Sequence, residues 1–539
     1  MLRLITLSLA LITAYTTSAQ LSFQRISIAP GNTSGWPGEM KSINDTLYFQ
    51  GFTTDNGHEL WISDGTQNGT KLVKDINQGS SGSKPHGFTS FGNKVYFLAE
   101  SVSGLGDDLW QTDGTEAGTK PVILSGANGT TIKSQLYILN GKIYFVANTT
   151  AEGYELWESD GTYAGTKILK DIKPGIASSM PHNFVYYNNK LYFSAETDAE
   201  GHELWATDGT ATGTVLVSDI YAGGYGSYIG KPMVLNNTLY FTASNSSGRW
   251  LYKSAGTAAG TVPVIQLHTD SNPPNYTENT LVTGNKMYFT FQTYNDGMEL
   301  WVSDGTDTGT SLVKDIVPGY RDSYPDNLIA FNNKVYFAAG NPYRELYSTD
   351  GTTAGTKQIT RLADTTPAKY MYDLTVYNDY LYFAFRSDYY FQGNLYAISK
   401  NDGPLLNIRP VGSTTNIPII ASGSLYAHNQ TLYAAAWYDD DNGDELWLLK
   451  GIPSGIEKTA NGKRTFTLYP NPASNMLCIT TDAAYKQVRV TLTNTVGQII
   501  LTENTSSKNT ISLQGVAPGI YTATIDADGI RETQQLTIQ

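Results

Sequence analysis

The chain alternates short runs of aromatic and β-branched residues with turns rich in Asn, Asp and Gly. In residues 287–319, the runs MYFTFQ and MELWVS are separated by a turn containing Asp296-Gly297, and DGTDTGT follows the second run. Runs of this length, bounded by turn residues, predict β-strands, and Asn-Gly or Asp-Gly between two runs predicts a tight hairpin. Stretches of helix-forming residues are almost absent. The pattern predicts an all-β protein.

The strand pattern recurs with a period of about 48 residues, a length typical of four-stranded propeller blades. An apolar-Tyr-Phe triplet places its tyrosine at Tyr48, Tyr96, Tyr144, Tyr192, Tyr240, Tyr288, Tyr336, Tyr382 and Tyr433. An ELW-like triplet follows each, with its aromatic residue at Trp61, Trp110, Trp157, Trp205, Tyr252, Trp301, Tyr347, Tyr396 and Trp447. The seventh unit predicts strands at Leu328–Asn332, Lys334–Ala338, Glu345–Thr349 and Lys357–Arg361. The fold class predicted is a β-propeller of about nine four-stranded blades.

The two ends of the repeat predict a closed ring. The ninth unit stops after Trp447 without a fourth strand, and Phe23–Gly31 resembles the fourth-strand segments of the other units. An N-terminal strand that completes the last blade removes exposed sheet edges. Eight blades with one distorted unit is the alternative, because Asp402-Gly403-Pro404 replaces the usual turn of the eighth unit.

The turn Asp-Gly-Thr-x-x-Gly-Thr is the most regular polar motif. Its aspartates are Asp64, Asp113, Asp160, Asp208, Asp304 and Asp350, and Ala255 replaces the aspartate in the fifth unit. An aspartate that accepts hydrogen bonds from its own turn, followed by a glycine at positive φ, explains the motif without an ion. Calcium is the alternative, although it needs several more oxygen ligands. We therefore expect a structural turn and no cofactor.

The other residues that attract attention also follow the repeat. The tryptophans of the ELW triplets are expected in the core between blades, with sugar stacking as the alternative. His58 and His202 precede ELW at equivalent positions, and His86 and His182 follow proline at another, which indicates architecture. The acidic run 439–444 is expected to be a solvated turn. With no phosphate loop, HExxH helix, nucleophile elbow or Cys–His pair, the sequence predicts no enzyme.

The N-terminus predicts a signal peptide. Arg3 precedes an apolar run from Leu4 to Ala14, and Thr17 and Ala19 are small residues that suit cleavage after residue 19. The run is too short to span a bilayer, and no later stretch approaches the required ~20 residues. A formal net charge of −13 argues against a nucleic-acid partner. With a single cysteine, no intramolecular disulfide can form.

Two resemblances extend this interpretation. The repeated segment ELWxSDGTxxGTxLVKDI, over residues 22–450, resembles the ELWxxDGT repeat proteins of secreted bacterial polypeptides, which implies architecture only, and its DGT turn resembles the Asp-box of sialidase-type propellers. The C-terminal residues resemble the type IX (Por) secretion system sorting domain of Bacteroidota. The positions that carry this second resemblance are Tyr469, Pro470, Asn471, Pro472, Gly497, Pro518, Gly519 and Tyr521. It implies the type IX machinery as a partner and a product that is released or anchored at the outer-membrane surface after the tail is cleaved.

The expected organisation is therefore a signal peptide at 1–19, a propeller at 20–452, a linker at 453–464 and a sorting domain, read as a small Ig-like β-sandwich, at 465–539. The expected function is non-catalytic binding or adhesion by a secreted or cell-surface propeller, with a glycan or a protein as the ligand. A glycosidase or lyase on the same scaffold is the alternative, because propellers carry such activities.

Overall fold

The computed structural model describes residues 17–29, 34–123, 131–269, 279–362, 370–386, 393–400, 405–410, 419–420, 425–428, 431–437, 444–456, 466–469, 473, 475–481, 488–494, 498–505, 508–527 and 530–538. Every element among these residues is a β-strand, and the strands group by repeat unit into sheets. The expected all-β class with propeller-type sheets is confirmed.

The first seven units each form a separate sheet in chain order. Unit 1 contains β2 (Gly38–Ile43), β3 (Thr46–Thr53), β4 (Gly57–Ser63) and β5 (Lys71–Lys74). Unit 2 contains β6 (His86–Phe91), β7 (Lys94–Ala99), β8 (Asp108–Thr112) and β9 (Lys120–Ile123). Unit 3 contains β10 (Thr131–Ile132), β11 (Tyr137–Leu139), β12 (Lys142–Thr149), β13 (Gly153–Ser159) and β14 (Lys167–Lys170). Unit 4 contains β15 (His182–Tyr187), β16 (Lys190–Thr197), β17 (Gly201–Thr207) and β18 (Val215–Ser218).

Units 5 to 7 repeat the plan. Unit 5 contains β19 (Met233–Leu235), β20 (Thr238–Asn245), β21 (Gly248–Ser254) and β22 (Val262–His268). Unit 6 contains β23 (Thr280–Thr283), β24 (Lys286–Thr293), β25 (Gly297–Ser303) and β26 (Ser311–Leu312). Unit 7 contains β27 (Asp326–Phe331), β28 (Lys334–Ala339), β29 (Glu345–Thr349) and β30 (Lys357–Gln358). The four strands expected in unit 7 are present, but the fourth ends at Gln358 and not at Arg361.

The last units share one sheet with the N-terminal strand. Unit 8 contains β31 (Tyr370–Tyr377), β32 (Tyr380–Arg386), β33 (Gly393–Ser399) and β34 (Leu406–Pro410). Unit 9 contains β35 (Ile419–Ile420), β36 (Tyr426–His428), β37 (Thr431–Trp437) and β38 (Glu445–Ile456). β1 (Thr17–Ile26) lies between β34 and β38, parallel to the first and antiparallel to the second. The N-terminal strand is thus the outer strand of unit 9.

Two expected boundaries differ from the structure. β1 begins at Thr17, because Thr17–Ala19, placed in the signal peptide by the sequence, continue the pairing with β34. β38 runs to Ile456, so the strand includes residues 453–456 of the expected linker, and Gly455 and Ile456 pair with β1. Residues 1–16 and the turn at 402–404 lie outside the described residues.

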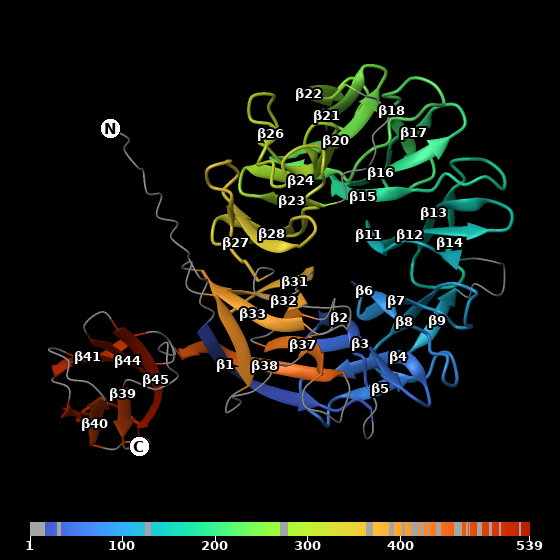
Figure 1. The fold of residues 1–539 in the computed structure, drawn as a ribbon. Helices are drawn as coiled ribbons and strands as arrows, with labels where there is room; N and C mark the ends of the chain where they lie inside the picture. Colours follow the sequence, from blue (N-terminus) through green and yellow to red (C-terminus); the bar gives the residue numbers. More distant parts are fainter. Residues whose placement is uncertain are drawn as a thin grey trace, which may run out of the picture.

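The sheets are arranged around a ring, with β1 beside β38 (Figure 1). First strands of neighbouring units contact one another, namely β2 with β6, β15 with β19, β19 with β23, β23 with β27, β27 with β31, and β31 with β36. β36 in turn contacts β2, so the last unit meets the first.

The core consists of apolar clusters between successive sheets. Between units 3 and 4, for example, Tyr144 and Leu156 pack with Phe193 and Trp205. The same kind of cluster joins the ends of the ring, where Leu446 and Leu448 of unit 9 and Ile26 of β1 pack with Phe49 and Trp61 of unit 1. Because both faces of an inner sheet are covered in this way, strands with apolar residues on both faces are stable here.

The C-terminal residues form a two-layer sandwich (Figure 1). One sheet contains β39 (Phe466–Tyr469), β40 (Met476–Thr481) and β43 (Lys508–Ser512). The other has the order β42 (Ile499–Thr505), β41 (Val488–Asn494), β44 (Gly519–Ala527) and β45 (Ile530–Ile538). Alternate residues of both sheets, such as Leu477, Val490 and Ile525, build a separate apolar core.

Candidate functional site

Strand order divides each propeller unit into two ends. Turns between first and second strands, and the Asp-Gly-Thr turns between third and fourth strands, lie at one end, which we call the Asp-turn end. Turns between second and third strands, and the connections to the next unit, lie at the other end, which we call the connector end. Gly57 illustrates the second grouping: an added Cβ would lie 2.5 Å from the amide nitrogen of Gly82 in the connection to unit 2.

The Asp-Gly-Thr turn is a closed hydrogen-bond network. In unit 4, Asp208 Oδ1 accepts from the backbone nitrogen (2.9 Å) and hydroxyl (2.7 Å) of Thr210. Thr214 donates its hydroxyl to the Thr210 carbonyl at 2.7 Å, and Gly213 donates its nitrogen to Thr210 Oγ1 at 2.9 Å. The hydrogen bonds from Thr210 lower the pKa of Asp208. In unit 5, where Ala255 replaces the aspartate, the bonds among the remaining residues of the turn persist.

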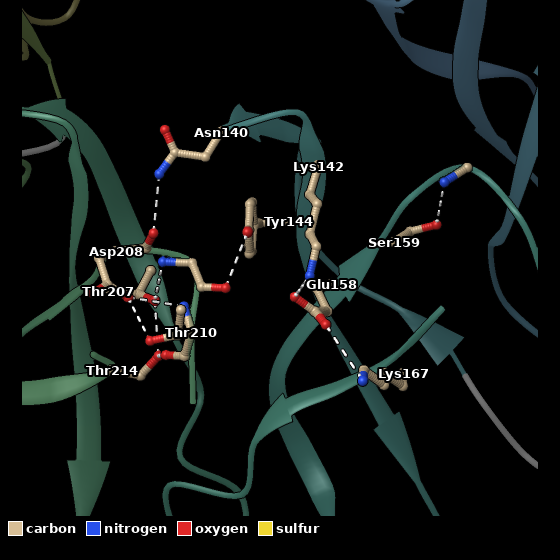
Figure 2. Close-up of polar contacts among 12 residues, drawn as sticks. Asn140, Lys142, Tyr144, Glu158, Ser159, Lys167, Thr207, Asp208, Thr210 and Thr214 are labelled. Atoms are coloured by element: carbon tan, nitrogen blue, oxygen red, sulfur yellow. Dashed lines mark hydrogen bonds and ion pairs between the residues drawn. The ribbon is translucent and has the colours of Figure 1, made fainter. Parts of the chain in front are cut away.

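Each Asp-Gly-Thr turn also receives a tyrosine from the preceding unit. Tyr144 donates its hydroxyl to the Gly209 carbonyl at 3.4 Å, and Asn140 donates its side-chain amide to the Asp208 carbonyl at 3.1 Å (Figure 2). A Cβ on Gly209 would lie 2.5 Å from that tyrosine oxygen. Burial, followed by the charges of Glu158 and Asp208, raises the pKa of Tyr144 to about 12. The two most regular motifs of the sequence therefore meet across the unit boundary.

The glutamate of the ELW triplet holds the connector end together. Glu203 is fully buried and accepts hydrogen bonds from the backbone nitrogens of Ile220 (2.9 Å) and Tyr221 (3.1 Å) and from the hydroxyl of Ser227 (2.7 Å). Glu59, Glu155 and Glu299 accept equivalent hydrogen bonds, in each case including one from the hydroxyl of the serine in the connection. Burial raises the pKa of Glu59, Glu203 and Glu299 to about 7. Sequence reasoning gave this glutamate no role, because its partners lie about 17 to 24 residues away.

The same arrangement closes the ring. Glu445 accepts a hydrogen bond from the backbone nitrogen of Ile28 at 2.7 Å and lies 3.5 Å from Arg25. Gly35 and Trp36 donate their backbone nitrogens to the Asp444 carbonyl at 2.7 and 3.1 Å. The segment after β1 thus has the contacts that an internal connection has, such as those of Ser227 and Tyr228 with the His202 carbonyl.

In the segments that lead into units 1, 2, 4, 5 and 7, the residue that follows the buried serine or glycine has a left-handed backbone. Trp36, Lys84, Met180, Tyr228 and Tyr324 have φ between 35° and 50°. Non-glycine residues rarely adopt this conformation, and they persist in it only where the surroundings impose it. The backbone conformation at this position is therefore the same in these five units, while the side chain differs.

These side chains and the two residues flanking the neighbouring turn form what we call the connector-end rim. Its members are Trp36, Phe52 and His58 in unit 1; Lys84, Glu100 and Asp107 in unit 2; Met180, Glu196 and His202 in unit 4; Tyr228 in unit 5, where Ser244 and Arg249 are buried; and Tyr324 and Arg344 in unit 7, where Gly340 has no side chain. The repeating residues build the frame, and the rim is where equivalent positions carry different chemistry.

The rim of units 1 and 2 changes from aromatic to charged. Trp36 stacks on His58, with ring centroids 5.8 Å apart and planes inclined by 18°. In unit 2 the equivalent Lys84 lies 3.4 Å from Glu100, and His86 Nε2 lies 3.5 Å from a carboxylate oxygen of Asp107. Trp36 and Lys84 occupy equivalent backbone positions, so the same backbone conformation is compatible with an indole or an ammonium group.

Unit 4 also carries a group of titratable side chains on the rim. Glu196 lies 3.1 Å from His202 Nε2 and 2.6 Å from Lys173 Nζ. The ring of His182 lies 5.8 Å from that of His202. Desolvation lowers the pKa of His202, against the opposing effect of the Glu196 charge. A lysine thus neutralises the acid of this group.

The histidines named in the sequence analysis as architecture belong to this surface. His58 and His202 are rim residues, while His86 and His182 open the first strands beside the rim. The signal that could have identified the surface was present in the sequence: these positions vary from unit to unit within an otherwise repeated segment. Of the tryptophans considered for sugar stacking, Trp61, Trp110, Trp157 and Trp205 are instead enclosed, at most 8% exposed, and Trp301 is partly buried.

The sorting-domain positions are only partly described. Tyr469 ends β39, and Gly519 begins β44 directly after Pro518. Tyr521 donates its hydroxyl to the Ala517 carbonyl at 2.7 Å. Pro470, Asn471, Pro472 and Gly497 lie outside the described residues. Over the described part of the whole chain, no group of three or more His, Cys, Asp or Glu side chains could hold a metal ion.

Comparison with known families identifies the tail. Residues 467–539 match the family described as the secretion system C-terminal sorting domain. The type IX sorting tail indicates export to the cell surface or the medium and an interaction with the type IX secretion machinery. No helix in the described portion of the chain is long and apolar enough to cross a membrane. No curated protein matches the chain.

Solved structures that are similar to the chain include propeller-containing peptidases. A puromycin hydrolase is 12% identical with a TM-score of 0.36, and the match covers 69% of this chain and 62% of the hydrolase. The β-propeller domain of the trilobed protease from Pyrococcus furiosus is 11% identical with a TM-score of 0.35, and the match covers 68% of this chain and 95% of that domain. The chain spans less than two thirds of the length of the puromycin hydrolases.

Proposed function

We propose that the mature chain is a binding or adhesion protein of the cell surface or the medium, and that its ligand contacts the connector-end rim. The observation that carries the proposal is that rim side chains differ between units although the backbone that bears them has the same conformation. Tyr228 and Met180 share one backbone conformation and one set of backbone hydrogen bonds, yet present different side chains. Loops that vary on a rigid scaffold are where proteins place recognition.

A binding role without catalysis is supported by the charge pairing on the rim. Glu196 is paired with Lys173, and Asp326 lies 2.6 Å from Arg344. A general acid or base needs a pKa matched to its task and access to the bond being broken. A carboxylate that is ion-paired with a lysine or an arginine stays charged and holds its neighbours in place, which suits a rigid binding surface better than proton transfer.

The attached tail supports the location. After passage through the type IX machinery, removal of the tail would leave the propeller either released or anchored at the outer-membrane surface. The chain has a single cysteine and so forms no intramolecular disulfide. The stability that an exported protein needs comes instead from the apolar clusters between units.

The test uses the purified full chain on arrays of glycans and proteins, together with an assay for newly formed reducing ends. Saturable binding without turnover is expected. Bond cleavage that is lost in E196Q would overturn the proposal. E158Q is the matched control, because Glu158 is likewise paired with a lysine, Lys142 at 2.6 Å, but belongs to the Asp-turn end.

A further inference from the structure

Exposed tyrosines gather at the connector end of units 6 and 7. Tyr294, Tyr320, Tyr324 and Tyr343 are 58%, 76%, 46% and 44% exposed. We call these four residues the tyrosine cluster. Among the described residues of the two units, every exposed large hydrophobic side chain at this end is a tyrosine, since the remaining one, Val282, lies near the opposite end of β23.

The cluster stands on three loops that are fastened to one another. Asp322, in the connection from unit 6 to unit 7, accepts a hydrogen bond from the backbone nitrogen of Met298 at 2.7 Å and from the Gln292 side chain at 3.2 Å. The side chain of Asn341 donates to the Asp322 carbonyl at 3.2 Å. The turn bearing Tyr294 and the turn bearing Tyr343 are therefore both held against the connection that bears Tyr320 and Tyr324.

Two further contacts fix Tyr324 at the centre of this platform. Arg344 donates to the Tyr324 carbonyl and lies 2.6 Å from Asp326. The hydrogen bond between the Tyr324 hydroxyl and Asp322 raises the pKa of the tyrosine. Gly340 follows β28, the second strand of unit 7, at the position where other units carry Phe52, Glu100 or Glu196. No side chain from this position therefore lies beside the tyrosines.

The chemistry of the cluster suits a ligand with apolar faces and a hydroxylated edge. A tyrosine presents a flat apolar ring together with a polar hydroxyl, and it loses little conformational entropy on binding. A sugar ring offers C–H groups on its faces and hydroxyl groups around its edge. The loops that bear the tyrosines also carry the carboxylate of Asp322, the amide of Asn341 and the guanidinium of Arg344, which are polar groups suited to hydrogen-bonding such an edge.

We propose that the tyrosine cluster binds a neutral polysaccharide. The net charge of −13 opposes a polyanionic ligand. The exposed apolar groups of these loops are tyrosines alone. Protein interfaces are also enriched in tyrosine and arginine, so binding of a protein in place of a polysaccharide is one of the outcomes that the test distinguishes. The inference rests on the proposed binding function and adds the site and the class of ligand.

The test measures affinity of the purified full chain for soluble neutral polysaccharides, namely a β-glucan, a xylan and a mannan, by affinity electrophoresis and titration calorimetry. The variant is Y320A combined with Y343A, since both side chains are exposed and the hydrogen bonds of Asp322 remain. The matched control is Y163A combined with Y186A, whose tyrosines are 66% and 52% exposed in the Asp-Gly-Thr turn of unit 3 and near the first turn of unit 4, both at the Asp-turn end.

The expected result is binding of at least one polysaccharide that falls tenfold or more in the Y320A/Y343A variant and is unchanged in the control, with equal melting temperatures. Polysaccharide binding that survives in this variant would overturn the site but leave the proposed function standing. Binding of only a protein or a charged glycan would overturn the ligand class. A chain that binds nothing on any array would overturn the proposed function itself.

Discussion

Tyr433, in the last repeat unit, packs its hydroxyl against Gly65, in the first. A Cβ on Gly65 would lie 3.3 Å from the tyrosine oxygen, and burial, followed by the charge of Asp64, raises the pKa of Tyr433. Tyr144 and Gly209 show the same relationship inside the ring. The contact between a tyrosine and a turn glycine that joins neighbouring units therefore also joins the first and last units. We expect substitutions at these glycines to destabilise the propeller.

Substituting Gly209 should destabilise the propeller more than substituting Gly223. Both have positive φ, +93° and +89°, so alanine costs about 1–2 kcal/mol of backbone strain at either position. At Gly209 the new Cβ would also lie 2.5 Å from the Tyr144 oxygen, while at Gly223 nothing lies within 4 Å. We expect G209A to cost about 2–5 kcal/mol in total, measured as the shift in the urea midpoint. Equal shifts for G209A and G223A would contradict the contact between units.

Asp208 and Gly213 should be energetically coupled. A Cβ on Gly213 would lie 2.0 Å from Asp208 Oδ1, so G213A must displace the carboxylate from its hydrogen bonds with Thr210. In D208A that obstacle is absent. We expect the double variant to be more stable than the sum of the single effects predicts, by about 1–2 kcal/mol. Strict additivity in a double-mutant cycle of denaturation free energies would refute the coupling.

The propeller should be more stable at pH 5 than at pH 8. Burial raises the pKa of Glu203 to about 7, well above the ordinary value of a glutamate. A group with a raised folded-state pKa contributes stability that is fully present below its unfolded pKa and is lost as the pH rises through about 7, on the order of 3 kcal/mol for such a shift. Melting temperatures measured between pH 4.5 and 8 test this.

The matched variant for the pH experiment is E203Q, which cannot titrate. We expect its melting temperature to depend less on pH across this window than that of the wild type. It should also be lower at pH 5, because the glutamine nitrogen replaces one of the two carboxyl oxygens and cannot accept the backbone hydrogen bond, from Ile220 or from Tyr221, which that oxygen receives. If E203Q and the wild type had parallel pH profiles, Glu203 would not be the source of the dependence.

Removing residues 467–539 should stop export. The family match assigns this segment to the sorting tail, and its separate apolar core means that the propeller keeps its own contacts when the tail is absent. Cell fractionation should find the shortened chain inside the cell with an unchanged melting temperature. Normal delivery of the shortened chain to the surface or the medium would contradict the role of the tail.

The sequence by itself determined the repeat unit, its four strands and the residues of its turns. These features are local: Asp208 accepts hydrogen bonds from a residue two positions away, and strand pairing within a unit needs only a tight hairpin. The resemblance of the tail was likewise visible from short motifs. A count of nine units also follows from the sequence alone, whereas the count of closed blades stays a prediction.

Only the tertiary structure decided what the repeated residues contact across unit boundaries. The partners of Glu203 lie up to 24 residues away, and Gly209 lies 65 residues from Tyr144. Neither spacing produces a local periodicity, so no pattern in the sequence could assign them. For the same reason the tyrosine cluster was missed: Tyr294 and Tyr343 are distant in the chain, and only the hydrogen bonds of Asp322 with the two turns hold them against one connection.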